Sequence, residues 1–349
     1  MHNTMTALRR AARDLFSIPA STAYLNAAYV GPSLRATTAA MAAGARRKAE
    51  PWTVTTDTFY DDAARARTLF ADLIHGRSTE VALVPSASYG AAVAAANLLP
   101  HVRPSQNVVT LAQEHCSNRF VWQLGADRGR YENRVVPAPG RLPAGVSWTD
   151  TVLGSIDEAT ALVAVVPSFW TTGHTLDLLA VGRACRAVGA ALVVDGTQSI
   201  GATAFDVREI QPDFVVCSGY KWLLCPYGVS FLWAAPKYAA APDASTIEFH
   251  GWDTLDSGRG RATWGLPGGE ELDTGRLDLS GSSEARRFDG GEVCALLPHQ
   301  SVCANACTPA HTTRSQRALM LHTRAHRVHQ RLWLAARRTL RLGSSAAIG

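Results

Sequence analysis

The sequence predicts an α/β protein with a mostly parallel central sheet and helices on both of its faces. Six short runs between residues 80 and 235 are continuously apolar and rich in β-branched residues, which is typical of strands buried on both faces. Helix-like stretches separate most of these runs, and such alternation favours parallel pairing. The length of 349 residues allows one large domain of this kind and a smaller one.

The elements are expected in a simple order along the chain. The predicted strands are 80–84, 107–111, 161–166, 191–195, 214–218 and 229–233. Crossover helices are predicted at 91–99, 117–124 and 178–189, with two earlier helices at 33–49 and 57–75. Residues 22–33 are predicted to form an entry loop, and 252–284 a long exposed loop. Ligands of such sheets bind at the carboxyl ends of the strands, where this chain has its unusual residues.

Composition and charge exclude several classes of protein. No apolar run is long enough to cross a bilayer, and the first dozen residues lack the apolar core of a secretory signal. The seven cysteines show no C-x-x-C spacing, which favours a reducing, cytoplasmic setting. The net charge is +5, but eight arginines and no acid follow Glu292, so residues 1–292 carry −3. No basic patch interleaved with aromatics occurs in this body, so no nucleic-acid partner is expected.

Asp195 ends the predicted strand 191–195, and Gly196 and Thr197 turn the chain after it. A carboxylate at a buried strand end is costly unless it meets a positive partner. The protonated pyridine nitrogen of pyridoxal 5′-phosphate (PLP) is such a partner, and a carboxylate there maintains the electron sink of that cofactor. A helix-capping or salt-bridged Asp is the alternative interpretation.

Lys221 follows the next strand end within three residues, after Ser218 and Gly219. Only three lysines occur against 31 arginines, and lysine forms imines whereas arginine does not. In an apolar setting its pKa would be depressed, which would make it a better nucleophile. A lysine of this kind can also be a snorkelling surface residue, but the nearby Asp195 favours the chemical role.

Two further strand ends complete the candidate site. After strand 80–84, small residues lead directly into a helix, whose free N–H groups favour a phosphate; Ala87 offers a backbone donor and Ser88 adds a hydroxyl. His115 follows strand 107–111 and could stack on a pyridine ring, or it could be a surface histidine. Cys116 suggests a Cys–His dyad, but adjacent side chains in a strand-like turn are expected to point apart.

The order of the segments S-A-S-Y-G, E-H-C-S-N, V-V-D-G-T-Q and S-G-Y-K-W closely resembles the class V aminotransferases of PLP fold type I. That family includes cysteine desulfurases, selenocysteine lyases, isopenicillin N epimerase-like and C–S lyase-like enzymes. The resemblance covers roughly residues 15–298, including A-Y-L-N-A-A-Y-V-G-P-S near the N-terminus and R-R-F-D-G-G-E at 286–292. It implies a homodimer with active sites at the subunit interface.

The resemblance also implies a role for each matched residue. Lys221 is expected to hold PLP as a Schiff base, His115 to stack on its ring, and Asp195 to pair with its ring nitrogen. Gln198 is expected to bind the phenolic oxygen. The phosphate-binding residues implied are Ala87, Ser88, Ser218 and Tyr220, with Tyr220 where many relatives have histidine. No metal site is expected.

Three departures from the family pattern leave the substrate open. Trp170 stands where desulfurases have an asparagine, and Glu292 where a partner-subunit threonine usually contacts the phosphate. The mobile-loop cysteine of desulfurases and the carboxylate-binding arginine have no clear counterparts; Cys303, Cys307 and Arg317 occur in unmatched contexts.

The prediction is therefore a PLP-dependent enzyme acting on an amino acid, by C–S bond cleavage or by amino transfer. The alternative is a catalytically impaired, PLP-binding family member that lacks a functional small domain. A sugar aminotransferase-like use of the site agrees less well with the motifs.

Four parts of the chain are expected: an N-terminal segment (1–30), a PLP-binding large domain (31–255), a loop with the start of a small domain (256–298), and an atypical basic tail (299–349). The tail contains five of the eleven histidines and eight arginines with no acid. It resembles the product of a shifted reading frame in GC-rich coding sequence, and its small domain is expected to be incomplete and poorly ordered. His322, His326 and His329 share one helix face there, but without a carboxylate they are not expected to bind metal.

Overall fold

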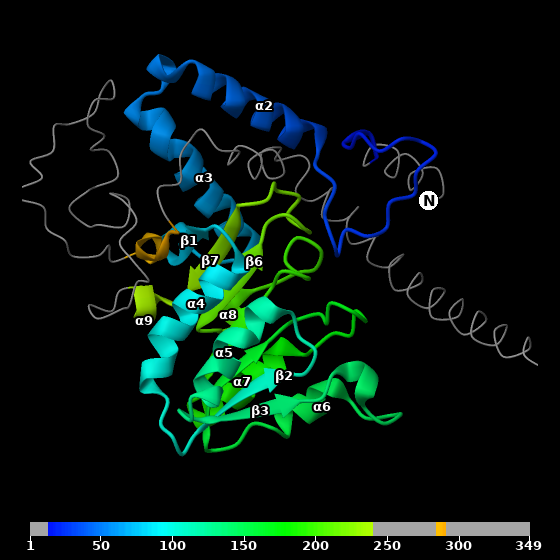
Figure 1. The fold of residues 1–349 in the computed structure, drawn as a ribbon, viewed down its shortest axis with the longest axis vertical. Helices are drawn as coiled ribbons and strands as arrows, with labels where there is room; N and C mark the ends of the chain where they lie inside the picture. Colours follow the sequence, from blue (N-terminus) through cyan, green and yellow to red (C-terminus); the bar gives the residue numbers. More distant parts are fainter. Residues whose placement is uncertain (1–12, 240–283, 291–349) are drawn as a thin grey trace, which may run out of the picture.

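The computed structural model describes residues 13–239 and 284–290, and a seven-stranded sheet forms its centre (Figure 1). The strands are β1 (Val81–Val84), β2 (Asn107–Leu111), β3 (Glu132–Val136), β4 (Thr160–Val165), β5 (Ala191–Asp195), β6 (Phe214–Ser218) and β7 (Ser230–Ala234). Their order across the sheet is β1-β7-β6-β5-β4-β2-β3. Neighbouring strands are parallel except at β7, which is antiparallel to both β1 and β6. The predicted mostly parallel α/β fold is confirmed.

All six strands predicted from apolar runs are present, each within one residue of the expected bounds. The sequence pattern missed β3, which pairs only with β2 at one edge of the sheet. Four of its five residues are exposed or half-buried, so it lacks the continuous apolar run of a central strand. The pattern also did not reveal that β7 reverses direction, because a strand buried on both faces has the same composition in either orientation.

Helices cover both faces of the sheet. The α-helices are α2 (Arg35–Ala49), α3 (Thr56–Ile74), α4 (Ala87–Leu98), α5 (Phe120–Asp127), α6 (Trp148–Leu153), α7 (Leu178–Val188), α8 (Val207–Ile210) and α9 (Pro236–Ala239). Successive side chains of each strand point to opposite faces, and two apolar cores result. Ala82 and Val84 belong to the core with α4 and α5, whereas Val81 and Leu83 belong to the core with α3, α6 and α7.

The helices begin and end at residues suited to those positions. Ser86 caps α4, since its hydroxyl accepts the N–H of Tyr89 at 3.1 Å. Asp177 caps α7 in the same way, and Gly189 ends that helix with φ at 73°, the left-handed conformation that glycine adopts most readily. Gly90 allows α4 to approach β6, since a Cβ there would lie 2.8 Å from Val216 Cγ1.

Residues 284–290 return to the sheet from a distant part of the sequence and pack against β1. The N–H of Gly290 donates to the carbonyl of Leu83 at 3.0 Å, and the N–H of Leu83 donates to Asp289 Oδ1 at 2.7 Å. Asp289 is fully buried and forms an ion pair with Arg67 of α3. These contacts attach the R-F-D-G stretch at 287–290 to the large sheet.

The predicted loop 252–284, apart from its last residue, lies outside the described residues, as does the basic tail 299–349. Within the described ranges, no helix is both long and apolar enough to cross a membrane. The same ranges hold no cluster of three or more metal-ligating side chains.

Candidate active site

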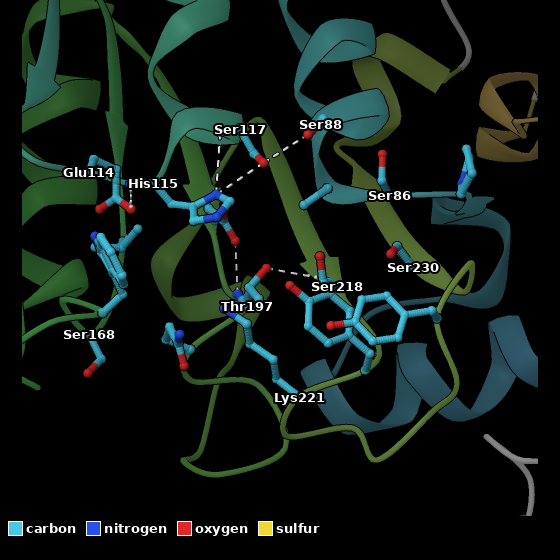
Figure 2. Close-up of a pocket in the computed structure, with 18 of the residues that line it drawn as sticks. Ser86, Ser88, Glu114, His115, Ser117, Ser168, Thr197, Ser218, Lys221 and Ser230 are labelled. Atoms are coloured by element: carbon cyan, nitrogen blue, oxygen red, sulfur yellow. Dashed lines mark hydrogen bonds between the residues drawn. The ribbon is translucent and has the colours of Figure 1, made fainter. Parts of the chain in front are cut away.

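A cavity of about 210 Å³ lies at the carboxyl ends of β1, β2, β5 and β6, beside the start of α4 (Figure 2). Its lining includes Ala87, Ser88, His115, Asp195, Gln198, Ser218, Tyr220 and Lys221. These are all eight of the site residues expected from the sequence, and they come from four different strand ends. The structure therefore brings the whole predicted set together, although it does not by itself assign their roles.

Small and hydroxyl-bearing residues form one end of this cavity. Ser86, Ala87 and Ser88 begin the 12-residue helix α4, whose first N–H groups have no partner within the helix. Ser218, the last residue of β6, and Ser230, the first of β7, are register partners in the antiparallel pair, and both are buried. Helix N–H groups, the helix dipole and hydroxyls together suit a phosphate.

Ser230 was not predicted as a site residue. It lies eight positions beyond the end of the S-G-Y-K-W motif (218–222) and has no motif of its own. Only the antiparallel return of β7 places it beside Ser218. Thr197 is a second omission: its hydroxyl accepts the N–H of Ser218 at 3.0 Å and so joins the ends of β5 and β6.

His115 lies in a constrained turn after β2. Gln113 adopts φ at 59°, and its carbonyl accepts the indole N–H of Trp170 at 2.9 Å. His115 Nδ1 accepts the N–H of Ser117 at 3.4 Å and lies 3.2 Å from its hydroxyl, which in turn accepts a 2.8 Å bond from Ser88. The imidazole is thus connected to the start of α4, and its edge-on contact with Trp170 has ring centroids 6.1 Å apart.

Cys116 lies nearer to His115 than expected. Its sulfur is 3.8 Å from His115 Nδ1, so the expectation that the two side chains point apart is wrong. The reason is that the turn enters a short 3-10 helix at Cys116–Asn118 instead of continuing as extended chain. Nδ1 nevertheless also accepts from Ser117, so the thiol is one of several neighbours of this atom.

Asp195 is buried at the end of β5, with 6% of its surface exposed. Its Oδ1 accepts the N–H of Thr197 at 2.9 Å. Burial raises the pKa of Asp195, and the bonds from Thr197 and the nearby Lys221 and His115 oppose that rise. A carboxyl group in this environment would be stabilised as an anion by a further cation in the cavity.

Lys221 is also buried, with 8% of its surface exposed, in the turn after β6. Burial lowers its pKa, and the nearby acidic residues Asp195 and Glu114 oppose the shift. Its Nζ lies 5.7 Å from the centre of the Tyr220 ring. A lysine with a lowered pKa has a larger fraction of neutral amine at neutral pH, which is the nucleophilic form.

The entry segment 22–33 forms part of the wall around this turn. The N–H of Gly31 donates to the carbonyl of Tyr220 at 2.9 Å. Gln198 donates from Nε2 to the carbonyl of Ala28 at 2.9 Å and accepts the indole N–H of Trp222 at 3.0 Å. One N–H of the Gln198 amide is therefore engaged by the chain itself, which leaves its second N–H for the expected contact with a ligand.

Aromatic rings flank the cavity on two sides. Trp170 is 45% exposed and lines one wall next to His115. Tyr220 stacks on Tyr227 with ring centroids 4.1 Å apart and 16° between the ring planes. Tyr227 was not singled out in the sequence, because the loop after Lys221 returns it to Tyr220: Leu224 has φ at 58°, and the N–H of Cys225 donates to the carbonyl of Gly219 at 3.0 Å.

The model of the family called Aminotransferase class-V matches residues 41–245, more than half of the chain. The chain belongs to the class-V aminotransferase family. This confirms the resemblance inferred from the four motifs, and all eight expected site residues fall inside the matched span. The family is one of PLP-dependent enzymes that includes desulfurases and epimerases.

Curated relatives carry two kinds of name. A probable cysteine desulfurase of Methanothermobacter thermautotrophicus is 34% identical over 170 residues, which cover 49% of this chain and 41% of the relative. An isopenicillin N epimerase of Amycolatopsis lactamdurans is 28% identical over 232 residues, covering 63% and 56%. The chain spans about half the length of these curated relatives.

Solved structures share the fold at lower identity. The apo cysteine desulfurase of Thermococcus onnurineus NA1 superposes with a TM-score of 0.66 at 17% identity, over 84% of this chain and 70% of that one. A lysine-to-alanine mutant of C-DES, with glycine covalently linked to its PLP cofactor, gives 0.68 at 20% identity, over 89% and 74%. At these identities the likeness shows the fold alone.

The chemical environments of the cavity residues fit PLP. The start of α4 with its surrounding serines suits the phosphate, and the buried carboxyl of Asp195 suits a cationic ring nitrogen. Lys221 has the burial and the lowered pKa that an imine-forming amine requires.

Proposed function

We propose that this family member is a PLP-dependent enzyme that acts on an amino acid, and that Lys221 is its point of covalent attachment to the cofactor. The observation that supports this best is the convergence of Asp195 and Lys221, both buried, on one cavity beside the start of α4. Either residue alone has ordinary structural interpretations. Together, beside a site suited to phosphate, a buried acid can pair with the ring nitrogen of PLP and a buried lysine can bind the cofactor covalently.

When bound, PLP supplies an electron sink for bond changes at the Cα of an amino acid. Ala87, Ser88, Ser218 and Tyr220 would bind its phosphate, with Ser230 as an additional hydroxyl. Asp195 would keep a proton on the ring nitrogen, and Gln198 would donate its second N–H to the phenolic oxygen. His115 would limit the tilt of the ring from one face, because its own turn is fixed by Trp170 and Ser117.

Lys221 would have a second task once the substrate amine has displaced it. Its neutral Nζ can accept the proton from the substrate Cα and return it, since burial favours the uncharged amine. The outcome would depend on where the proton is returned and which bond to Cα or Cβ breaks. The relatives include enzymes named for desulfuration and for epimerisation, so the reaction class within the family is itself part of the proposal.

The test is an absorption spectrum of the protein expressed with PLP, followed by a panel of amino acids. Binding of PLP with a visible band, and a change of that band with one or a few amino acids, is the expected result. A bound cofactor that no amino acid perturbs would favour the catalytically impaired alternative. We also propose a homodimer, which sedimentation of the cofactor-loaded protein would test.

A further inference from the structure

Glu114 is a buried acid in the cavity wall to which the proposed function assigns no role. It follows β2, immediately before His115, and only 8% of its surface is exposed. Its Oε1 accepts the backbone N–H of His115 at 2.6 Å, as Figure 2 shows. The carboxyl group therefore binds the main chain of the residue expected to stack on the cofactor.

The second oxygen of Glu114 is in a different situation. Oε2 is buried and has no hydrogen-bond partner among the residues that the structure describes. A buried, partly unpaired carboxylate is far more costly than a neutral carboxyl group in the same place. Since Oε1 is the acceptor of the His115 N–H, the proton of the neutral form belongs on Oε2.

We propose that Glu114 is a positioning residue that acts in its uncharged form, holding the main chain of His115 so that the imidazole points into the cavity. Other contacts hold the turn on either side of Glu114, among them the bond from the Asn118 N–H to the His115 carbonyl at 3.0 Å. Gln113 is in the left-handed conformation, which is unfavourable for a non-glycine residue, and Trp170 holds its carbonyl. The bond from the His115 N–H to Glu114 Oε1 holds the main chain at the end of this turn, where His115 begins.

The charges around Glu114 agree with the neutral form. The titratable groups that face it are Asp195 from the end of β5, Lys221 from the turn after β6, and His115 beside it in the chain. Burial raises the pKa of Glu114 to about 8, and the charge of Asp195 adds to the rise. The His115 N–H and Lys221 oppose it without cancelling it.

A first experiment tests the charge state on the protein without cofactor. Between pH 4.5, the ordinary pKa of a glutamate, and about pH 8, the folded protein keeps the proton on Glu114. The unfolded chain releases that proton in the same pH range. The free energy of unfolding of the wild type therefore decreases as the pH rises through this range. Glu114→Gln cannot ionise, so its melting temperature relative to wild type should increase by at least about 3 °C between about pH 5.5 and 8.5.

The exposed Glu158→Gln is the matched control and should follow the wild-type curve in parallel. If Glu114→Gln also runs parallel to wild type, the uncharged form is wrong. This result does not depend on cofactor or substrate, so it remains decisive even if the proposed function fails.

A second experiment tests positioning through the reactivity of His115 in the cofactor-free protein. Peptide mapping after diethyl pyrocarbonate treatment would give its modification rate, with His174 as an internal reference. Glu114→Ala should change the ratio of the two rates by about threefold or more, whereas Glu114→Gln retains an acceptor oxygen and should match wild type. If Glu114→Ala does not fold, Glu114→Asp replaces it, because its carboxyl is one methylene short.

A third experiment measures enzyme kinetics and rests on the proposed function. Glu114→Ala should lower kcat by roughly 10-fold or more with a smaller effect on KM, and Glu114→Gln should restore most of it at neutral pH. Wild type should lose activity as the pH rises through about 8, and Glu114→Gln should lack that loss. An alanine variant with unchanged His115 reactivity and unchanged turnover would overturn the positioning role.

Discussion

A Cβ atom on Gly31 would lie 1.9 Å from the carbonyl oxygen of Lys221. The entry segment and the lysine turn are therefore in direct backbone contact, although 190 positions separate them in the sequence. The adjoining bond from the Gly31 N–H to Tyr220 O fixes the same contact. Any side chain at position 31 must displace the turn that positions Lys221.

Gly31→Ala is expected to destabilise the protein by about 1–3 kcal/mol, because the added methyl group has no space. It should also weaken PLP binding, since the turn that must move contains Lys221. Urea unfolding and a PLP titration would measure the two effects. Gly140→Ala is the control, since its nearest neighbour would be Thr172 Cγ2 at 3.9 Å, an ordinary contact. Equal stability of the two variants would mean that the entry segment yields easily.

Lys221→Ala is expected to abolish covalent attachment of PLP, because Lys221 is the one lysine that lines the described cavity. Borohydride treatment and peptide mapping of wild type should find the cofactor on the peptide that contains Lys221. Lys221→Arg keeps a positive charge but cannot form an imine, so it separates charge from chemistry. Cofactor found on Lys48 or Lys237 would contradict the assignment.

Asp195→Asn is expected to leave PLP bound but to lower turnover on the order of 100-fold, since an amide does not hold the ring nitrogen in its protonated form. Turnover with the best amino acid of the panel and the PLP dissociation constant would be measured together. Asp127→Asn, at an exposed position of α5, should change neither. An unchanged rate in the Asp195 variant would indicate that this acid only caps the turn at Thr197.

We expect little cysteine desulfurase activity, because that reaction requires a nucleophilic thiolate to accept sulfur, and no cysteine occurs in the expected loop pattern. Among the described cysteines, Cys116 is exposed and the other three are buried. Mass spectrometry after incubation with cysteine would detect persulfide on any of them. Persulfide on Cys116, Cys303 or Cys307 during turnover would show that sulfur transfer does occur.

Limited proteolysis is expected to cleave near residue 300 and to leave the proposed PLP-binding body intact. The reason is compositional: residues 299–349 contain eight arginines and no acid, and an excess of like charge is unfavourable for a packed core. Intact mass and the retained absorption of bound PLP would identify the product. Protease resistance together with slow amide exchange in this region would instead identify a folded domain.

The sequence by itself was sufficient for the central strands and for the motif residues that follow them. Val193 and Val194, like Val215 and Val216, stand in apolar runs because both faces of their strands are covered. Asp195 and Lys221 could be predicted as neighbours because the carboxyl ends of adjacent parallel strands share one edge of a sheet. These are local patterns combined with one general rule of topology.

Only the tertiary structure decided the contacts between segments that have no common local pattern. Ser230 joins the cavity because β7 turns back antiparallel beside β6, and Glu114 is buried against the His115 main chain because the surrounding chain covers it. Gly31 reaches the turn after β6, and Asp289 reaches β1, from opposite ends of the described chain. Burial, register and close approach depend on every segment that packs around a residue, and a linear pattern contains only its neighbours in sequence.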